Sequence, residues 1–183
     1  MKLKHLFLIL AGIAGWSSST LLFADSTNGA AAESVQPLRV VVDSRVELMC
    51  VIFRLAGNPE YNTPGVKSYA DDVEKQFGKF RDHPAVKLAR KLSQTRKICY
   101  NAPMSLAVHL TDTTNLQLRV PLRPWPGGLD GRWTASDVNH FVKAARQFVK
   151  DTSFQTFIEQ HGPLYQITAA RISLSAEATI KVT

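Results

Sequence analysis

Hydrophobic residues recur every three or four positions along most of the chain beyond residue 43, the spacing of one face of an α-helix. Capping residues at the start of each run and Gly or Pro near its end divide this pattern into separate helices. The predicted helices cover residues 43–55, 68–80, 84–92, 101–111, 134–149, 152–161 and 163–172. The pattern therefore predicts a mainly α-helical single domain of six or seven helices within residues 38–183. Its first helix should be central, because it is apolar on most sides.

Four segments lack the helical pattern. Residues 25–37 are polar and alanine-rich without a period, so we expect a mobile lead-in. Residues 38–42 and 178–183 have a composition that favours short strands. Residues 120–133 hold three prolines and three glycines, which exclude a regular element there.

The first 24 residues have the layout of a secretory signal peptide. Lys2 and Lys4 precede an apolar run over residues 6–16, and Ala24 supplies the small residue at which a signal peptidase cuts. Residues 30–32, three alanines, offer a second cleavage site. A membrane anchor is the alternative, but the run is shorter than the roughly 20 apolar residues that span a bilayer. We therefore expect a periplasmic or secreted protein with no stable membrane span after cleavage.

The excess of positive charge is modest once the signal peptide is removed. Loss of Lys2 and Lys4 lowers the basic count from 22 to 20 against 15 acidic residues, so the net charge falls from +7 to +5. Part of the excess forms a basic group that a nucleic acid could bind, or that is simply the solvated face of a helix. This group comprises Lys87, Arg90, Lys91, Arg96 and Lys97. Export favours the second interpretation, and we expect no nucleic-acid partner.

The sequence contains no intact catalytic motif. No histidine is followed by Glu, and none has a second histidine one helical turn away, so a zinc-peptidase motif is absent. Ser105, His109 and Asp112 have spacings of four and three, which would place them on one helical face. A triad needs its base oriented from a separate element and an oxyanion hole, so local hydrogen bonding on a helix explains this spacing better. We predict no catalytic residue and no metal ligand.

Cys50 and Cys99 are the two cysteines, and export would permit one disulfide between them. Cys50 lies in the apolar run of residues 48–53, where a buried thiol acting as a small hydrophobic group is expected. Cys99 follows two basic residues, which favours a reactive thiol only slightly. Whether the two cysteines pair stays open.

A polar stripe interrupts the otherwise apolar first helix. Asp43, Glu47 and Arg54 fall within about 40° of each other at roughly 100° per residue. The polar segment of residues 58–62 follows directly. The stripe is either a solvated edge or the wall of a cleft that binds a peptide or another part of a larger protein.

Four strings around this stripe resemble a known family. They are VDSRVEL (residues 42–48), IFRLAGNPEYN (52–62), FRDHPAV (80–86) and MSLAVHLTD (104–112). They are similar to the N-terminal half of an exported bacterial family, domain of unknown function 4932, over residues 38–172. Longer members of that family carry a downstream His-Glu-x-x-His motif, in which zinc polarises a water that the Glu deprotonates.

The resemblance implies a zinc-metallopeptidase-like protein, but only for the full-length relatives. This chain lacks the zinc motif, so we expect no cofactor and an inert, truncated fragment. The change of pattern after Arg171 suggests an interrupted reading frame and an incomplete domain. The alternative is a non-enzymatic exported helical module that binds a peptide or protein partner. In both cases the expected substrate or partner contacts are Arg45, Glu47, Arg54, Asn58, Glu60, Tyr61, His109 and Asp112.

Overall fold

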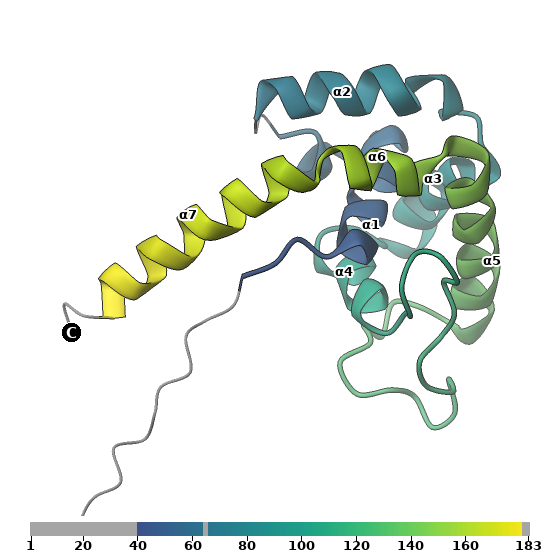
Figure 1. The fold of residues 1–183 in the computed structure, drawn as a ribbon. Coiled ribbons are helices and arrows are strands. Elements are labelled where there is room, and N and C mark those ends of the chain that lie inside the picture. The colour runs from purple at the N-terminus through teal and green to yellow at the C-terminus, as the bar shows by residue number, and fades with distance from the viewer. Residues whose placement is uncertain (1–39, 64–65, 181–183) are drawn as a thin grey trace, which may run out of the picture. The chain divides into compact units, whose positions relative to one another are not determined.

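The structure is a computed structural model that describes residues 40–63 and 66–180, with side chains up to residue 173. Within these residues the chain forms seven α-helices and two short 3-10 helices, shown in Figure 1. The elements are α1 (Ser44–Leu55), η1 (Pro59–Tyr61), α2 (Lys67–Phe77), η2 (Gly78–Phe80), α3 (Pro84–Arg96), α4 (Asn101–Val108), α5 (Ala135–Thr152), α6 (Phe154–Gln160) and α7 (Gly162–Ile180). The predicted mainly α-helical domain is confirmed.

Helix α1 lies at the centre of the core. Its residues Leu48, Met49, Ile52 and Phe53 have no exposed surface. The helix packs against α2, α3, α4 and η1, so the expectation of a central first helix is confirmed. Burial of these side chains stabilises the fold, because removing apolar surface from water is favourable.

A second part of the core is a cluster of phenylalanines between α2, α5 and α6. Phe77 of α2 lies with its ring centroid 6.0 Å from that of Phe148, 6.0 Å from that of Phe154 and 4.8 Å from that of Phe157. Tilted and edge-on aromatic pairs at these distances add to the stabilisation from burial alone. The cluster fixes α2 against the body of the domain.

The helix starts follow the capping residues. The carboxylate of Asp43 accepts a hydrogen bond from the Arg45 amide and begins α1. Pro84 occupies the first turn of α3, and the Thr134 hydroxyl accepts from the Asp137 amide at the start of α5. These three predicted starts are confirmed. Asn101, predicted to cap the next helix, is instead its first residue, and Tyr100 occupies the cap position.

The two strand predictions are wrong where the structure describes the residues. Residues 40–42 have no regular structure, and α7 continues as a helix through Ile180, whereas residues 38–39 and 181–183 lie outside the described part. Strand propensity is realised only where a neighbouring strand completes the hydrogen bonds. Among the described residues the only β pairing is an isolated bridge between Leu110 and Leu118.

The same bridge shortens the fourth predicted helix. α4 ends at Val108, because the backbone at Leu110 pairs with the segment returning at Leu118. Asp112 therefore lies beyond the helix, and the expected common helical face of Ser105, His109 and Asp112 does not form. The irregular character of residues 120–133 is confirmed.

The predicted signal peptide and lead-in, residues 1–37, lie outside the described residues. In the part of the chain that is described, no helix combines the length and the hydropathy required to cross a membrane.

Candidate functional site

Two neighbouring pockets lie on either side of η1, and five of the eight candidate contacts line them. Pocket A lies between α1 and α2 and has a volume of about 200 Å³. Its lining residues are Glu47, Cys50, Val51, Arg54, Tyr61, Thr63, Val66, Tyr69, Ala70 and Val73. Three of the predicted contacts, Glu47, Arg54 and Tyr61, therefore meet in one pocket.

Pocket B lies between η1 and the segment around the end of α3, with a volume of about 370 Å³. Its lining residues are Ala56, Gly57, Asn58, Pro59, Glu60, Arg90, Ser93, Gln94, Lys97, Cys99 and Tyr100. The predicted contacts Asn58 and Glu60 belong to this pocket. η1 therefore contributes residues to both pockets.

The polar end of pocket A is a hydrogen-bonded chain of Glu47, Tyr69 and Tyr165. The Tyr69 hydroxyl donates to the Glu47 carboxylate and lies 2.9 Å from the Tyr165 hydroxyl at the start of α7. Burial raises the pKa of Glu47 above its ordinary value, against the opposing effect of the Tyr69 hydrogen bond. Burial raises the pKa of the Cys50 thiol to about 12 and also raises the pKa of Tyr69. The thiol and the phenol therefore keep their protons at neutral pH, and neither is a nucleophile.

Replacing Glu47 with glutamine is expected to stabilise the protein at neutral pH. The pKa of this carboxyl is higher in the folded state than in the unfolded state, so the stability of the protein falls as pH rises above the unfolded pKa. Glutamine still accepts the Tyr69 hydrogen bond but has no charge to desolvate. Urea unfolding between about pH 4 and about pH 8 should show a shallower fall in stability for Glu47→Gln than for the wild type. The exposed Glu159→Gln is the control, and an unchanged slope in Glu47→Gln would contradict the assignment.

Arg54 is the cation of pocket A. Its Nη1 donates to the Tyr61 carbonyl oxygen at 3.2 Å. In the described part of the chain Arg54 forms no ion pair, and Nε and Nη2 have no hydrogen-bond partner. The carboxylic acid of the same pocket, Glu47, is engaged with Tyr69 instead. Arg54 therefore has two donors, Nε and Nη2, that are available to a ligand in pocket A.

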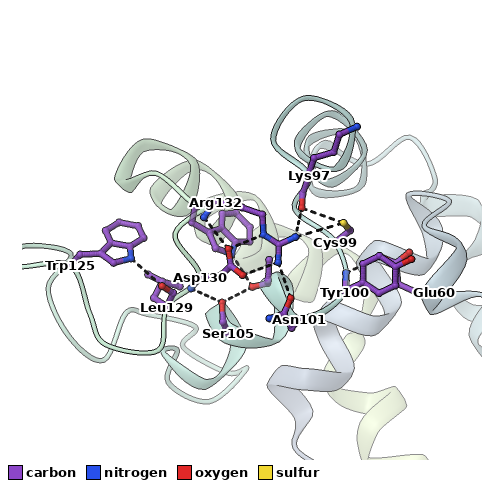
Figure 2. Close-up of polar contacts among 12 residues, drawn as sticks. Glu60, Lys97, Cys99, Tyr100, Asn101, Ser105, Trp125, Leu129, Asp130 and Arg132 are labelled. Carbon is purple, nitrogen blue, oxygen red and sulfur yellow. Dashed lines mark hydrogen bonds and ion pairs between the residues drawn. The ribbon is translucent and has the colours of Figure 1, made fainter.

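Among the described residues, Tyr100 is the one aromatic residue that lines pocket B, with 66% of its surface exposed. Its backbone has φ 54° and ψ −115°, a conformation that residues other than glycine rarely adopt and that costs about 1–3 kcal/mol. Two contacts hold it there. The Tyr100 amide donates to Glu60 Oε1 at 3.0 Å, and the Tyr61 hydroxyl donates to the Tyr100 carbonyl oxygen at 2.5 Å. Figure 2 shows Glu60 beside Tyr100.

Three predicted contacts thus act by holding Tyr100. Asn58 Nδ2 donates to Glu60 Oε1 at 3.1 Å, which orients the carboxylate that receives the Tyr100 amide. Glu60 and Tyr61 then fix the two peptide groups on either side of the Tyr100 Cα atom. Their role is to position an exposed aromatic ring that the sequence analysis did not identify.

The basic group of residues 87–97 is divided by the fold. Arg90 and Lys97 line pocket B. Neither forms an ion pair in the described residues. Arg90 Nε donates to the Ala56 carbonyl oxygen at 3.2 Å. Lys87 pairs with Asp82 at 3.3 Å, and Arg96 pairs with Asp137 at 3.5 Å. Two of the five basic residues therefore belong to the site, and the sequence analysis missed them.

A network around Arg132 fixes the segment that carries Tyr100 (Figure 2). Arg132 Nη1 donates to the Lys97 carbonyl oxygen at 2.7 Å, and Nη2 donates to Asn101 Oδ1 at 2.8 Å. The same guanidinium pairs with Asp130 at 2.7 Å. Since Asp130 and Arg132 belong to the loop of residues 120–133, this loop is tied to the turn between α3 and α4.

The other three predicted contacts lie outside both pockets. Arg45 pairs with Asp43 and donates from Nη1 to the Leu110 carbonyl oxygen at 2.6 Å. His109 places Nδ1 2.6 Å from the Ser105 carbonyl oxygen and Nε2 3.0 Å from that of Gly127. Asp112 accepts from the Thr114 amide in a local turn. Arg45 and His109 bond to backbone carbonyls of the segments that follow α4, and His109 also lines a separate pocket of about 400 Å³ with residues of the 120–133 loop.

Comparisons with known proteins returned no matching family model, no matching curated protein and no matching solved structure. The resemblance to the domain of unknown function 4932 family stays a prediction. Among the described residues, no three His, Cys, Asp or Glu side chains are grouped so as to hold a metal ion.

Proposed function

We propose that the chain is an exported, non-catalytic helical domain that binds a peptide segment across η1, over pockets A and B. The observation that carries this proposal is Tyr100, an exposed aromatic ring held in a strained backbone conformation by Glu60 and Tyr61. Backbone strain that the surrounding structure maintains is concentrated at binding sites. Exposed tyrosines supply a large contact area at low entropic cost.

The placement of the two pockets favours an elongated ligand. Pocket B, at about 370 Å³, is near the lower end of the roughly 300–1,000 Å³ of typical small-molecule sites, and pocket A, at about 200 Å³, is smaller. Because η1 contributes residues to both pockets, a ligand that uses both must be elongated. An extended peptide presents successive side chains in this way.

The protonation of the site supports binding rather than catalysis. The thiol of Cys50 and the phenol of Tyr69 hold their protons, so pocket A lacks an activated nucleophile from these groups. If the resemblance to the domain of unknown function 4932 family is correct, the same surface would hold a peptide substrate in the longer relatives. Of the two functions expected from the sequence, the helical module that binds a peptide or protein partner is the one that this proposal develops.

Replacing Tyr100 with alanine is expected to weaken the binding of peptides to this surface. Peptides enriched on the purified chain from a displayed library of random short peptides should bind Tyr100→Ala roughly 30-fold more weakly, the loss typical of an aromatic hot spot. Trp125→Ala is the matched control, because Trp125 is 38% exposed and lies outside both pockets. Binding constants come from fluorescence titration of each enriched peptide.

A second variant separates binding from stability. Tyr100→Gly removes the ring but suits the positive φ, so it should raise the free energy of unfolding by about 1 kcal/mol while losing the same affinity. A library that yields no enriched peptide, or peptides that bind Tyr100→Ala as well as the wild type, would overturn the proposal.

A further inference from the structure

Pocket A combines an apolar wall with one unpaired guanidinium. Val51 and Val73 are 1% and 2% exposed and form the inner wall, whereas Val66, 58% exposed, lies at the rim. Ala70 completes the apolar side. A surface of this composition accepts an aliphatic side chain, because burial of such a side chain is favourable and leaves no polar group unsatisfied.

The free guanidinium edge of Arg54 determines which polar group the ligand should carry. Its Nη1 is used by the Tyr61 carbonyl oxygen, which leaves Nε and Nη2, the two donors of one guanidinium edge, without a partner in the described residues. This edge matches the two oxygens of a carboxylate in a bidentate pair. Because Arg54 forms no ion pair in the described residues, no carboxylate of the protein competes for the position.

A carboxylate and an aliphatic side chain occur on a single residue at the C-terminus of a peptide. The volume of pocket A, about 200 Å³, is enough for one residue. An aspartate or glutamate side chain would satisfy Arg54 but would leave the valine wall without an apolar partner. The C-terminal residue satisfies both.

We infer that pocket A binds the C-terminal residue of the peptide, with the carboxylate on Arg54 and an aliphatic side chain against Val51, Ala70 and Val73. This inference rests on the proposed function for the identity of the ligand as a peptide. Preceding residues of the peptide then cross η1 toward Tyr100 in pocket B.

The inference is tested with N-acetyl-leucine, which carries only the terminal carboxylate and the aliphatic side chain. Titration into the ¹⁵N-labelled chain should shift the Arg54 Nε–Hε resonance saturably. N-acetyl-leucine amide, which lacks the charge, should bind roughly tenfold more weakly or not at all. N-acetyl-aspartic acid α-amide places the carboxylate on a side chain, and it too should bind at least about tenfold more weakly.

Variants assign the effect to Arg54. Arg54→Gln should lose about tenfold or more in affinity for N-acetyl-leucine, and Arg54→Lys should lose severalfold because it keeps the charge without the planar fork. Arg119→Gln, an exposed arginine outside both pockets, should leave the affinity unchanged. Far-UV circular dichroism and the melting temperature confirm that each variant is folded.

The two proposals fail separately. Equal binding of the acid and the amide, stronger binding of the aspartate compound, or no binding of N-acetyl-leucine to the wild type overturns the assignment of pocket A. The proposal that peptides bind through Tyr100 would be unaffected in that case. If N-acetyl-leucine binds through Arg54 while no peptide depends on Tyr100, the carboxylate site stands and the peptide surface over pocket B is wrong.

Discussion

Replacement of Phe77 with alanine is expected to lower the free energy of unfolding by roughly 3–5 kcal/mol. Phe77 has no exposed surface and packs against Phe148, Phe154 and Phe157, which come from two other helices. Alanine loses the transfer free energy of the ring and leaves a cavity that three rigid neighbours cannot fill. A domain of this size has a total stability of about 5–15 kcal/mol, so the variant should be marginal.

Urea denaturation followed by far-UV circular dichroism measures this loss. Phe80→Ala is the matched control, because Phe80 is half-buried and lies beside the same cluster, 6.3 Å from Phe148 between ring centroids. It should cost clearly less. A Phe77→Ala variant as stable as Phe80→Ala would show that α2 is not fixed by this cluster. Because α2 forms one wall of pocket A, Phe77→Ala should also weaken binding there.

The helices could be predicted from the sequence because their signals are local. The caps at Asp43 and Thr134 and the proline at position 84 act within one turn, so each start is visible without knowledge of the fold. The strand predictions failed for the opposite reason. A strand depends on a partner segment elsewhere in the chain, and residues 40–42 have none in the described structure.

The candidate site was predictable to the extent that it is contiguous in sequence. Glu47 and Arg54 share one face of α1, and Asn58, Glu60 and Tyr61 follow on the adjoining turn, so a single segment supplies one side of both pockets. His109 and Asp112 were grouped with them by the resemblance alone. The fold places them in loops after α4, where backbone hydrogen bonds account for them.

Tyr100 could not be predicted because its distinguishing features are not in the local pattern. Its positive φ occurs at a turn that contains no glycine, and the residues that hold it, Glu60 and Tyr61, are about 40 positions earlier. Arg90 and Lys97 were missed for a different reason. The sequence analysis assigned them to a basic group on a solvated helix face, and only the fold shows that both line a pocket with residues of η1.

Replacement of Arg132 with alanine is expected to cost about 2 kcal/mol of stability, the scale of hydrogen bonds made by a charged group. The variant loses the bonds to the Lys97 carbonyl oxygen and Asn101 as well as the pair with Asp130. Arg132→Lys should recover little, because one ammonium cannot reproduce this fork. Arg119→Ala, an exposed change near the same loop, is the control and should be close to neutral.

The loss of stability at low pH provides an independent test of the Arg132 network. Hydrogen bonds from Arg132 lower the pKa of Asp130 to about 2, so the folded state favours the ionised carboxylate. The resulting stabilisation is present above the unfolded carboxyl pKa of about 4 and is lost as pH falls from about 4 toward about 2. Arg132→Ala should therefore lose less of its melting temperature on acidification than the wild type.

Because Lys97 and Asn101 flank Tyr100, the same variant should also weaken peptide binding over pocket B. Full peptide affinity with reduced stability would mean that Glu60 and Tyr61 alone suffice to hold the ring.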